Sequence, residues 1–278
     1  MRIVGWLDRQ PVTYGNVGLY LRSKDPEAFA RGLEGVLFER VVRAEATELG
    51  ITVERALVQR ETTRRLAEWE AALRAAGREQ TGQDVDPGEW LRRVAGMTRA
   101  EFRAHLSRHT EIELLEDRLL RYELLRAERV EVSILVVRQR KQADELRERL
   151  RGGADFAELA RQDSSHTTAE QGGRIAFPLL KQDLNESNVA AELFSIPEGA
   201  VGGPFHTSTP EGDYYQIYRL ERRLPAGSGP YAVVAKQIER ALEARPVRVE
   251  EYERWRRRVL LRHGYQPAPP PAPGSAVD

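Results

Sequence analysis

Apolar side chains recur along the first 128 residues at the spacing of amphipathic helices. From Phe29 to Leu49 they return every three or four residues, and Gly50 follows as a residue that favours the end of a helix. A second helix is expected from an N-cap at Thr52 to a stop at Gly77, and a long third helix from Thr98. The other expected elements are a strand at 2–8, a turn at 9–11, a helix at 13–22, a polar loop at 78–86 and a short helix at 90–94.

The pattern changes at Arg129. Residues 130–137 are rich in β-branched side chains and bounded by charge, which is typical of a buried strand, and residues 214–220 alternate like a second strand. Helices are expected between them at 142–150 and after an N-cap at Asp155, with turns at 172–173 and 199–203. This order predicts a small α+β domain. Two further helices, 231–243 and one from Val249, precede a Pro-rich segment that predicts a flexible tail.

The composition narrows the classes of function. Lys and Arg number 43, as do Asp and Glu, so the net charge is zero and gives no general attraction to nucleic acid or anionic lipid. The absence of cysteine excludes disulfides, thiolate zinc sites and cysteine nucleophiles. No run approaches the roughly 18 apolar residues of a membrane span. The N-terminus lacks a signal-peptide pattern, so either the protein is cytoplasmic or an export signal has been removed.

The middle of the chain resembles the parvulin (PpiC-type) rotamase domain, because four motifs occur in the family's order and spacing. They are Ile134-Leu135-Val136 at the end of a strand, the run LRGGADFAELA at 150–160, Ser164 with Thr168-Ala169 and Gly172-Gly173, and the run FSIPEGAVGGP at 194–204.

The flanks resemble SurA- and PrsA-type chaperones. This resemblance rests on the runs LGITV at 49–53 and MTRAEFR at 97–103. It implies an α+β protein in which N-terminal helices and a returning C-terminal helix form a helical chaperone domain, with an inserted parvulin-like α/β domain. The implied boundaries are 1–128 for the N-terminal helices, 129–224 for the parvulin-like domain, 225–265 for the C-terminal helices and 266–278 for a disordered tail.

The resemblance also places a candidate site. Parvulins lower the barrier to X-Pro rotation with two histidines from neighbouring strands and a Cys or Asp, beside an apolar proline pocket. In this chain Ser133, His166 and Tyr215 stand at the positions of those polar groups, so both family histidines are replaced. The family's apolar substrate pocket maps to Ile175, Leu184, Val189 and Phe194.

Other chemistry is less well supported by the residues. His166 lies in a hydroxyl-rich loop, where it is either a polar group at the mouth of a peptide groove or an exposed loop histidine. A hydrolase built from Ser133, His166 and Asp163 would lack an oxyanion-hole motif. His105 and His109 share one helix face, but without the Glu of a zinc protease they favour a solvated surface. No metal and no cofactor are expected.

The function implied is that of a foldase or chaperone that binds extended segments of unfolded client polypeptides. Trp69, Trp90 and Phe102 are either part of an apolar client surface or part of an ordinary core. Two alternatives stay open: an active peptidyl-prolyl isomerase with an altered site, and a scaffold or assembly protein for one partner. The expected location is periplasmic or otherwise extracytoplasmic, with the cytoplasm as the alternative; no nucleic-acid partner is expected and a homodimer stays open.

Overall fold

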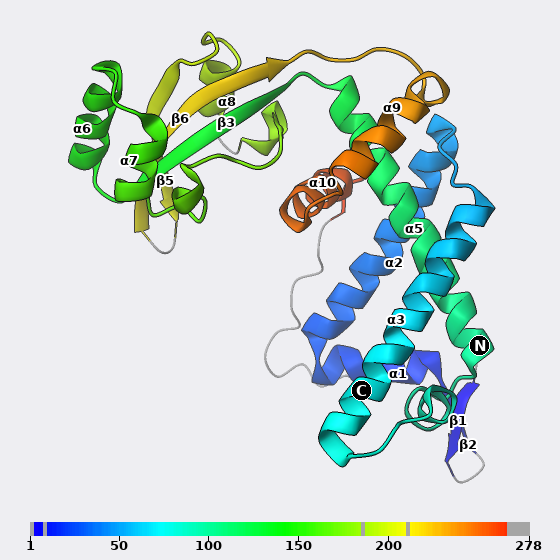
Figure 1. Ribbon diagram of the computed structural model, residues 1–278. Coiled ribbons are helices and arrows are strands. Elements are labelled where there is room, and N and C mark those ends of the chain that lie inside the picture. Colours follow the sequence, from blue (N-terminus) through cyan, green and yellow to red (C-terminus); the bar gives the residue numbers. More distant parts are fainter. Residues whose placement is uncertain (1–2, 8–9, 185–186, 210–211, 266–278) are drawn as a thin grey trace. The chain divides into compact units, whose positions relative to one another are not determined.

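The computed structural model describes residues 3–7, 10–184, 187–209 and 212–265 (Figure 1). Its contacts divide the chain into two compact units, Met1–Leu119 with Trp255–Asp278, and Leu120–Arg254. The predicted boundaries at 128, 224 and 265 stay predictions. The tail predicted at 266–278 lies outside the described residues.

In its described residues the first unit is helical apart from one hairpin, and its helices α2, α3 and α5 lie side by side (Figure 1). Part of α10 packs on α2, where the rings of Phe38 and Trp255 meet edge to face with centroids 5.5 Å apart. Arg262 on α10 also pairs with Glu45 on α2 at 2.8 Å. The returning C-terminal helix is therefore confirmed. The elements with all or most of their residues in this unit are β1 (Ile3–Leu7), β2 (Gln10–Thr13), α1 (Tyr14–Lys24), α2 (Pro26–Leu49), α3 (Arg55–Thr81), α4 (Pro87–Trp90), a π-helical turn (Leu91–Ala95), α5 (Arg99–Arg126) and α10 (Val249–Arg262).

Several helix ends differ from the predicted ones. Helix α3 continues through Gly77 and ends at Gly82, whose φ of 72° is left-handed. Gly77 has a packing role instead, because a Cβ there would come within 2.4 Å of a methyl group of Val85. Thr52 is not the N-cap; Glu54 is, and its side chain makes no capping hydrogen bond. The prediction at Thr98 is confirmed, since its hydroxyl accepts from the N–H of Glu101 at 3.2 Å.

The second unit contains a four-stranded antiparallel sheet in the order β4-β3-β6-β5. Helices α6 and α7 cover one face, and α8 lies on the other (Figure 1). The turn predicted at 199–203 is wrong in part, because β5 begins at Val201 and the glycines at 202 and 203 lie within the strand. The elements are β3 (Arg129–Val137), α6 (Arg140–Arg151), α7 (Phe156–Asp163), β4 (Leu179–Leu180), α8 (Ser187–Leu193), β5 (Val201–Thr209), β6 (Gly212–Leu224) and α9 (Tyr231–Ala244), with 3-10 turns at Ala169–Gln171 and Lys181–Asp183.

A loop closes the outer edge of β3. Strand β4 pairs only with Arg129 and Val130. Beyond it, Ile134 N–H donates to the carbonyl of Gly173 at 2.8 Å, and Ser165 N–H donates to the carbonyl of Val136 at 2.8 Å. The loop that carries His166 is therefore attached to β3 at both ends, which satisfies backbone groups that an edge strand would leave open.

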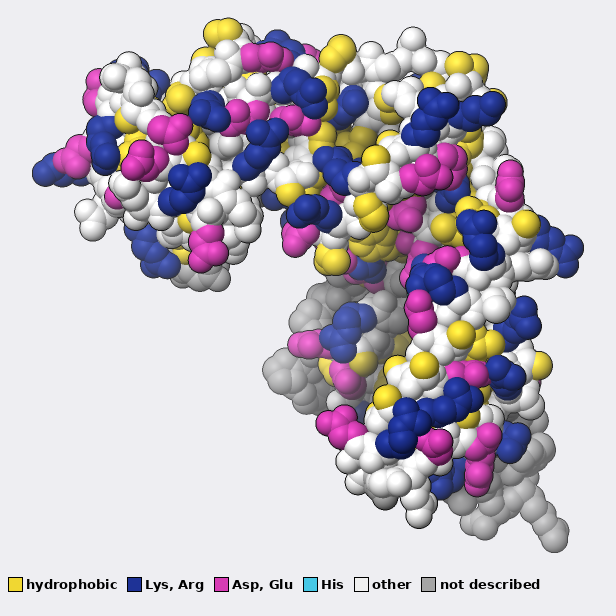
Figure 2. Space-filling model, viewed as in Figure 1, with side chains coloured by type: hydrophobic (Ala, Val, Ile, Leu, Met, Phe, Trp, Pro, Cys, Tyr) yellow, Lys and Arg dark blue, Asp and Glu magenta, His cyan; other side chains and the backbone are white. Residues whose placement is uncertain are grey.

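The predicted fold class, a helical domain combined with a small α/β domain, is confirmed. No described helix is long and apolar enough to cross a membrane. On the face shown in Figure 2, basic and acidic side chains are interspersed, in keeping with the zero net charge.

Candidate functional site

A small pocket opens on the α8 face of the sheet, and we call it the sheet pocket. Its volume is about 160 Å³, which suits one side chain rather than a whole small molecule. Five apolar side chains from β3, β4 and the segments around them form most of its wall, and six polar or charged residues complete it. The apolar residues are Ile134, Ile175, Leu179, Leu184 and Val189; the others are His166, Asp183, Thr207, Gln216, Tyr218 and Arg254.

Strand alternation decides which predicted residues reach this pocket. Side chains of a strand point alternately to its two faces. On β3, Ile134 faces the sheet pocket, so Ser133 faces the α6–α7 side, where its hydroxyl donates to Glu221 at 2.5 Å. On β6, Gln216 faces the pocket and Tyr215 packs against the core under α6 and α7. Ser133 and Tyr215 are therefore one residue away from the strand positions that line the pocket.

The apolar half of the predicted site comes together more completely. Ile175, Leu184 and Val189 all line the sheet pocket, together with His166. Phe194 does not line it; its ring lies in the core cluster of the same face, with the Lys181 ammonium 4.9 Å from its centroid. Sequence reasoning missed Gln216 and Ile134, although the period-two pattern of both strands contains the signal.

His166 is held in one orientation by its own loop. The N–H of Thr168 donates to Nδ1 at 3.2 Å, and the hydroxyl of Thr168 lies 2.8 Å from the same nitrogen. Burial lowers the pKa of His166 from its usual 6.5, and the positive charge of Arg254 lowers it further. The imidazole is therefore neutral near pH 7, and because Nδ1 accepts, the ring proton is assigned to Nε2.

Gln216 supplies a second group of donors. The phenol of Tyr218 donates to Gln216 Oε1 at 3.0 Å, so the amide NH₂ remains to donate elsewhere. The pocket therefore combines an apolar wall with two neutral donors, the His166 imidazole and the Gln216 amide. Such a site can hold an apolar ring and hydrogen-bond a carbonyl oxygen next to it.

Arg254, from α10, borders the sheet pocket. Its Nη1 donates to the carbonyl of Asp183 at 3.2 Å, and its guanidinium carbon lies 5.8 Å from the centroid of the Phe177 ring. The guanidinium is therefore held by a carbonyl and an aromatic face. From this position its positive charge adds to the effect of burial in lowering the pKa of His166.

The other candidate groups have structural partners. His109 Nε2 lies 3.0 Å from a carboxylate oxygen of Glu113 on α5. Within the described parts of the chain, no group of three or more His, Asp or Glu residues could hold a metal ion. Trp69 packs against Trp90 and Phe102, with ring centroids 5.9 and 4.6 Å away.

Comparison with known proteins relates this part of the chain to a family. Residues 137–218 match the family model described as the rotamase, PPIC-type PPIase domain. No curated protein matches the chain. Among solved structures, peptidylprolyl isomerase PrsA from Bacillus anthracis aligns over 85% of this chain and 99% of its own, at 16% identity and a TM-score of 0.39. Foldase protein PrsA from Streptococcus pneumoniae covers 95% of both chains at 16% identity and a TM-score of 0.36.

Proposed function

We propose that this chain, whose residues 137–218 match the PPIC-type rotamase family model, is a foldase that binds extended segments of unfolded polypeptides through the sheet pocket. The observation that carries the proposal is the composition of that pocket. Its apolar wall fits a single ring or branched side chain, while His166 and Gln216 present donors for a backbone carbonyl. An X-Pro segment offers both features, since proline has an apolar ring directly after a carbonyl.

The same geometry favours binding over fast turnover. Rotation about X-Pro must overcome a barrier of about 18–20 kcal/mol, and desolvating the proline and polarising the twisted amide both lower it. The sheet pocket contributes the desolvating wall, but among its lining residues His166 is the one imidazole. We therefore propose client binding as the main activity and slow isomerisation at an altered site as the alternative.

A peptide-binding measurement tests the proposal. A fluorescent extended peptide with a central Ala-Pro should bind, and Ile175→Trp should weaken its binding about tenfold because the indole would occupy a pocket that Ile175 lines. Val233→Trp is the matched control, since Val233 is an exposed apolar residue of α9 and does not line the pocket. Equal binding by both variants would refute the sheet pocket as the client site.

A proline-turnover assay then decides between binding and catalysis. We expect isomerisation of the same peptide near its uncatalysed rate. A clear acceleration that His166→Phe abolishes would instead identify the protein as an active isomerase. The extracytoplasmic location stays a prediction from the family resemblance.

A further inference from the structure

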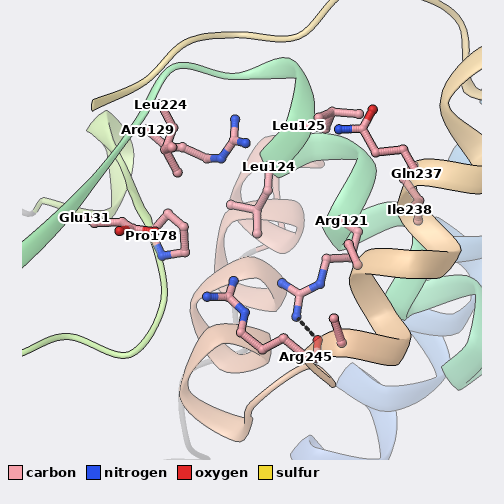
Figure 3. Close-up of a pocket in the computed structure, with 12 residues that line it drawn as sticks. Arg121, Leu124, Leu125, Arg129, Glu131, Pro178, Leu224, Gln237, Ile238 and Arg245 are labelled. Carbon is pink, nitrogen blue, oxygen red and sulfur yellow. Dashed lines mark hydrogen bonds between the residues drawn. The ribbon is translucent and has the colours of Figure 1, made fainter. Parts of the chain in front are cut away.

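A second, larger pocket lies in the Leu120–Arg254 unit, and we call it the arginine pocket. Its volume is about 330 Å³, and the end of α5, the start of β3 and helix α9 enclose it. Three guanidinium groups line it, those of Arg121, Arg129 and Arg245. In Figure 3 these groups are arranged around Leu124, with Arg121 and Arg245 on one side of it and Arg129 on the other.

The three arginines differ in how their charge is balanced. The charge of Arg121 is balanced by an ion pair with Glu251, and its guanidinium also donates to the carbonyl of Arg245 at 2.9 Å. Arg245 lies 3.6 Å from Glu251, a carboxylate that it shares with Arg121. Arg129 donates to two carbonyls, of Ala127 at 3.2 Å and Pro225 at 3.4 Å, and no described carboxylate lies within ion-pair distance of it.

The one acidic residue among those that line the arginine pocket, Glu131, does not neutralise the charge of Arg129. Glu131 lines the pocket, but its carboxylate oxygens pair with Arg222 at 3.0 Å and with Arg174 at 3.4 Å. Burial lowers the pKa of Arg129, and the positive charges of Arg245 and Arg222 lower it further against the attraction of Glu131. The attraction of a bound anion would offset the cost of burying this guanidinium and its repulsion by Arg245 and Arg222.

The rest of the wall selects among anions. Leu125, Pro178, Leu224 and Ile238 surround the arginines, so a ligand must carry an apolar body as well as a negative group. Inorganic phosphate would supply the negative charge but no apolar group to contact these side chains. Arginine pairs with a carboxylate through two parallel hydrogen bonds, which suits a planar carboxylate well.

We propose that the arginine pocket binds a carboxylate carried on a short, branched apolar group. Two sources offer that chemistry, the C-terminus of a polypeptide that ends in an apolar residue and a free branched-chain carboxylic acid. The proposal concerns a site separate from the sheet pocket and does not depend on the function proposed above.

Calorimetric titration of the full chain tests it with four probes. They are an acetylated tripeptide ending in leucine, the same peptide with its C-terminus amidated, 4-methylpentanoate and inorganic phosphate. Binding of the tripeptide acid but not of its amide supports the proposal with a polypeptide end as the source. Binding of 4-methylpentanoate alone supports it with a free acid as the source. If the amide or phosphate binds as tightly as the acids, or if no acid binds, the proposal is wrong.

Variants assign the binding to this pocket. Arg129→Gln should weaken binding of the acid about tenfold or more, because a hydrogen bond to a charged group is lost. Gln237→Glu adds a repelling carboxylate at an exposed lining position and should weaken it without removing any contact that the fold needs. Arg240→Gln on α9 is the control, since this exposed arginine does not line the pocket. An equal loss in the control would attribute the binding to overall charge and overturn the proposal.

Discussion

Arg121 and Glu251, which lie 130 positions apart in the sequence, form a buried ion pair between α5 and the start of α10. Their side chains are only 6% and 4% exposed. Arg121 also donates to the carbonyl of Arg245, so the pair ties three segments together. We expect Glu251→Gln to lower the free energy of unfolding by about 3–5 kcal/mol, because it leaves a buried guanidinium without its counter-charge.

Urea denaturation measures that change. The matched control is Asp144→Asn, which removes the carboxylate of the exposed Arg140–Asp144 pair on α6 and should cost less than about 1 kcal/mol. Similar losses in both variants would mean that burial does not set the strength of the Arg121–Glu251 pair.

Gly173 lies where the His166 loop passes β3. Its φ is 79°, and a Cβ there would come within 2.3 Å of the carbonyl oxygen of Ile134. We expect Gly173→Ala to destabilise the protein by more than about 2 kcal/mol, the sum of backbone strain and a clash with main chain. Gly199→Ala separates the two effects, since Gly199 has a φ of 82° but open space around it, and should cost about 1–2 kcal/mol. Thermal unfolding of both variants compares them.

The lowered pKa of His166 predicts a pH dependence of stability. When the folded-state pKa lies below the unfolded value near 6.5, the unfolded chain binds the proton more readily. The contribution of His166 is therefore complete above pH 6.5 and is lost as the pH falls toward the folded-state pKa. His166→Gln should flatten the wild-type decline in unfolding free energy between neutral and mildly acidic pH, as followed by urea denaturation at several pH values. An unchanged slope would contradict the assignment to this histidine.

Two predicted helix caps give a direct test of local structure. Asp155 accepts from the N–H of Glu158 at 2.8 Å, so Asp155→Ala should cost about 1 kcal/mol. Thr52→Ala should cost less than about 0.5 kcal/mol, because α3 begins after Glu54 and Thr52 is exposed. Chemical denaturation distinguishes the two, and a larger loss at Thr52 would contradict the observed start of α3.

The spacing of apolar residues predicts the fold class, because the 3.6-residue period of a helix and the two-residue period of a strand can both be recognised from residues close together in the sequence. The capping signals at Thr98 and Asp155 were correct, since each cap is a contact between residues three positions apart. The prediction that Gly77 ends a helix is wrong, because nothing local distinguishes a glycine that ends a helix from one that allows Val85 to approach.

The site was harder to predict than the fold. A shift of one residue along a strand moves a side chain to the other face, so the predicted residues Ser133 and Tyr215 point away from the pocket that Ile134 and Gln216 line. The sequence does not predict the arginine pocket. It joins Arg121, Arg129 and Arg245 from three segments, and no spacing in the sequence brings them together.

The attachment of the His166 loop to β3 has a consequence for recognition. Amides at Ile134 and Ile175 are bonded across this seam, and Ser164 Oγ accepts from the N–H of Val136 at 3.0 Å. Displacement of this loop from β3 would break these hydrogen bonds, so these amides should exchange with solvent as slowly as those between β3 and β6. The sheet pocket is thus preorganised. A client loses conformational freedom when it binds, whereas the residues of the pocket are already ordered in the folded protein.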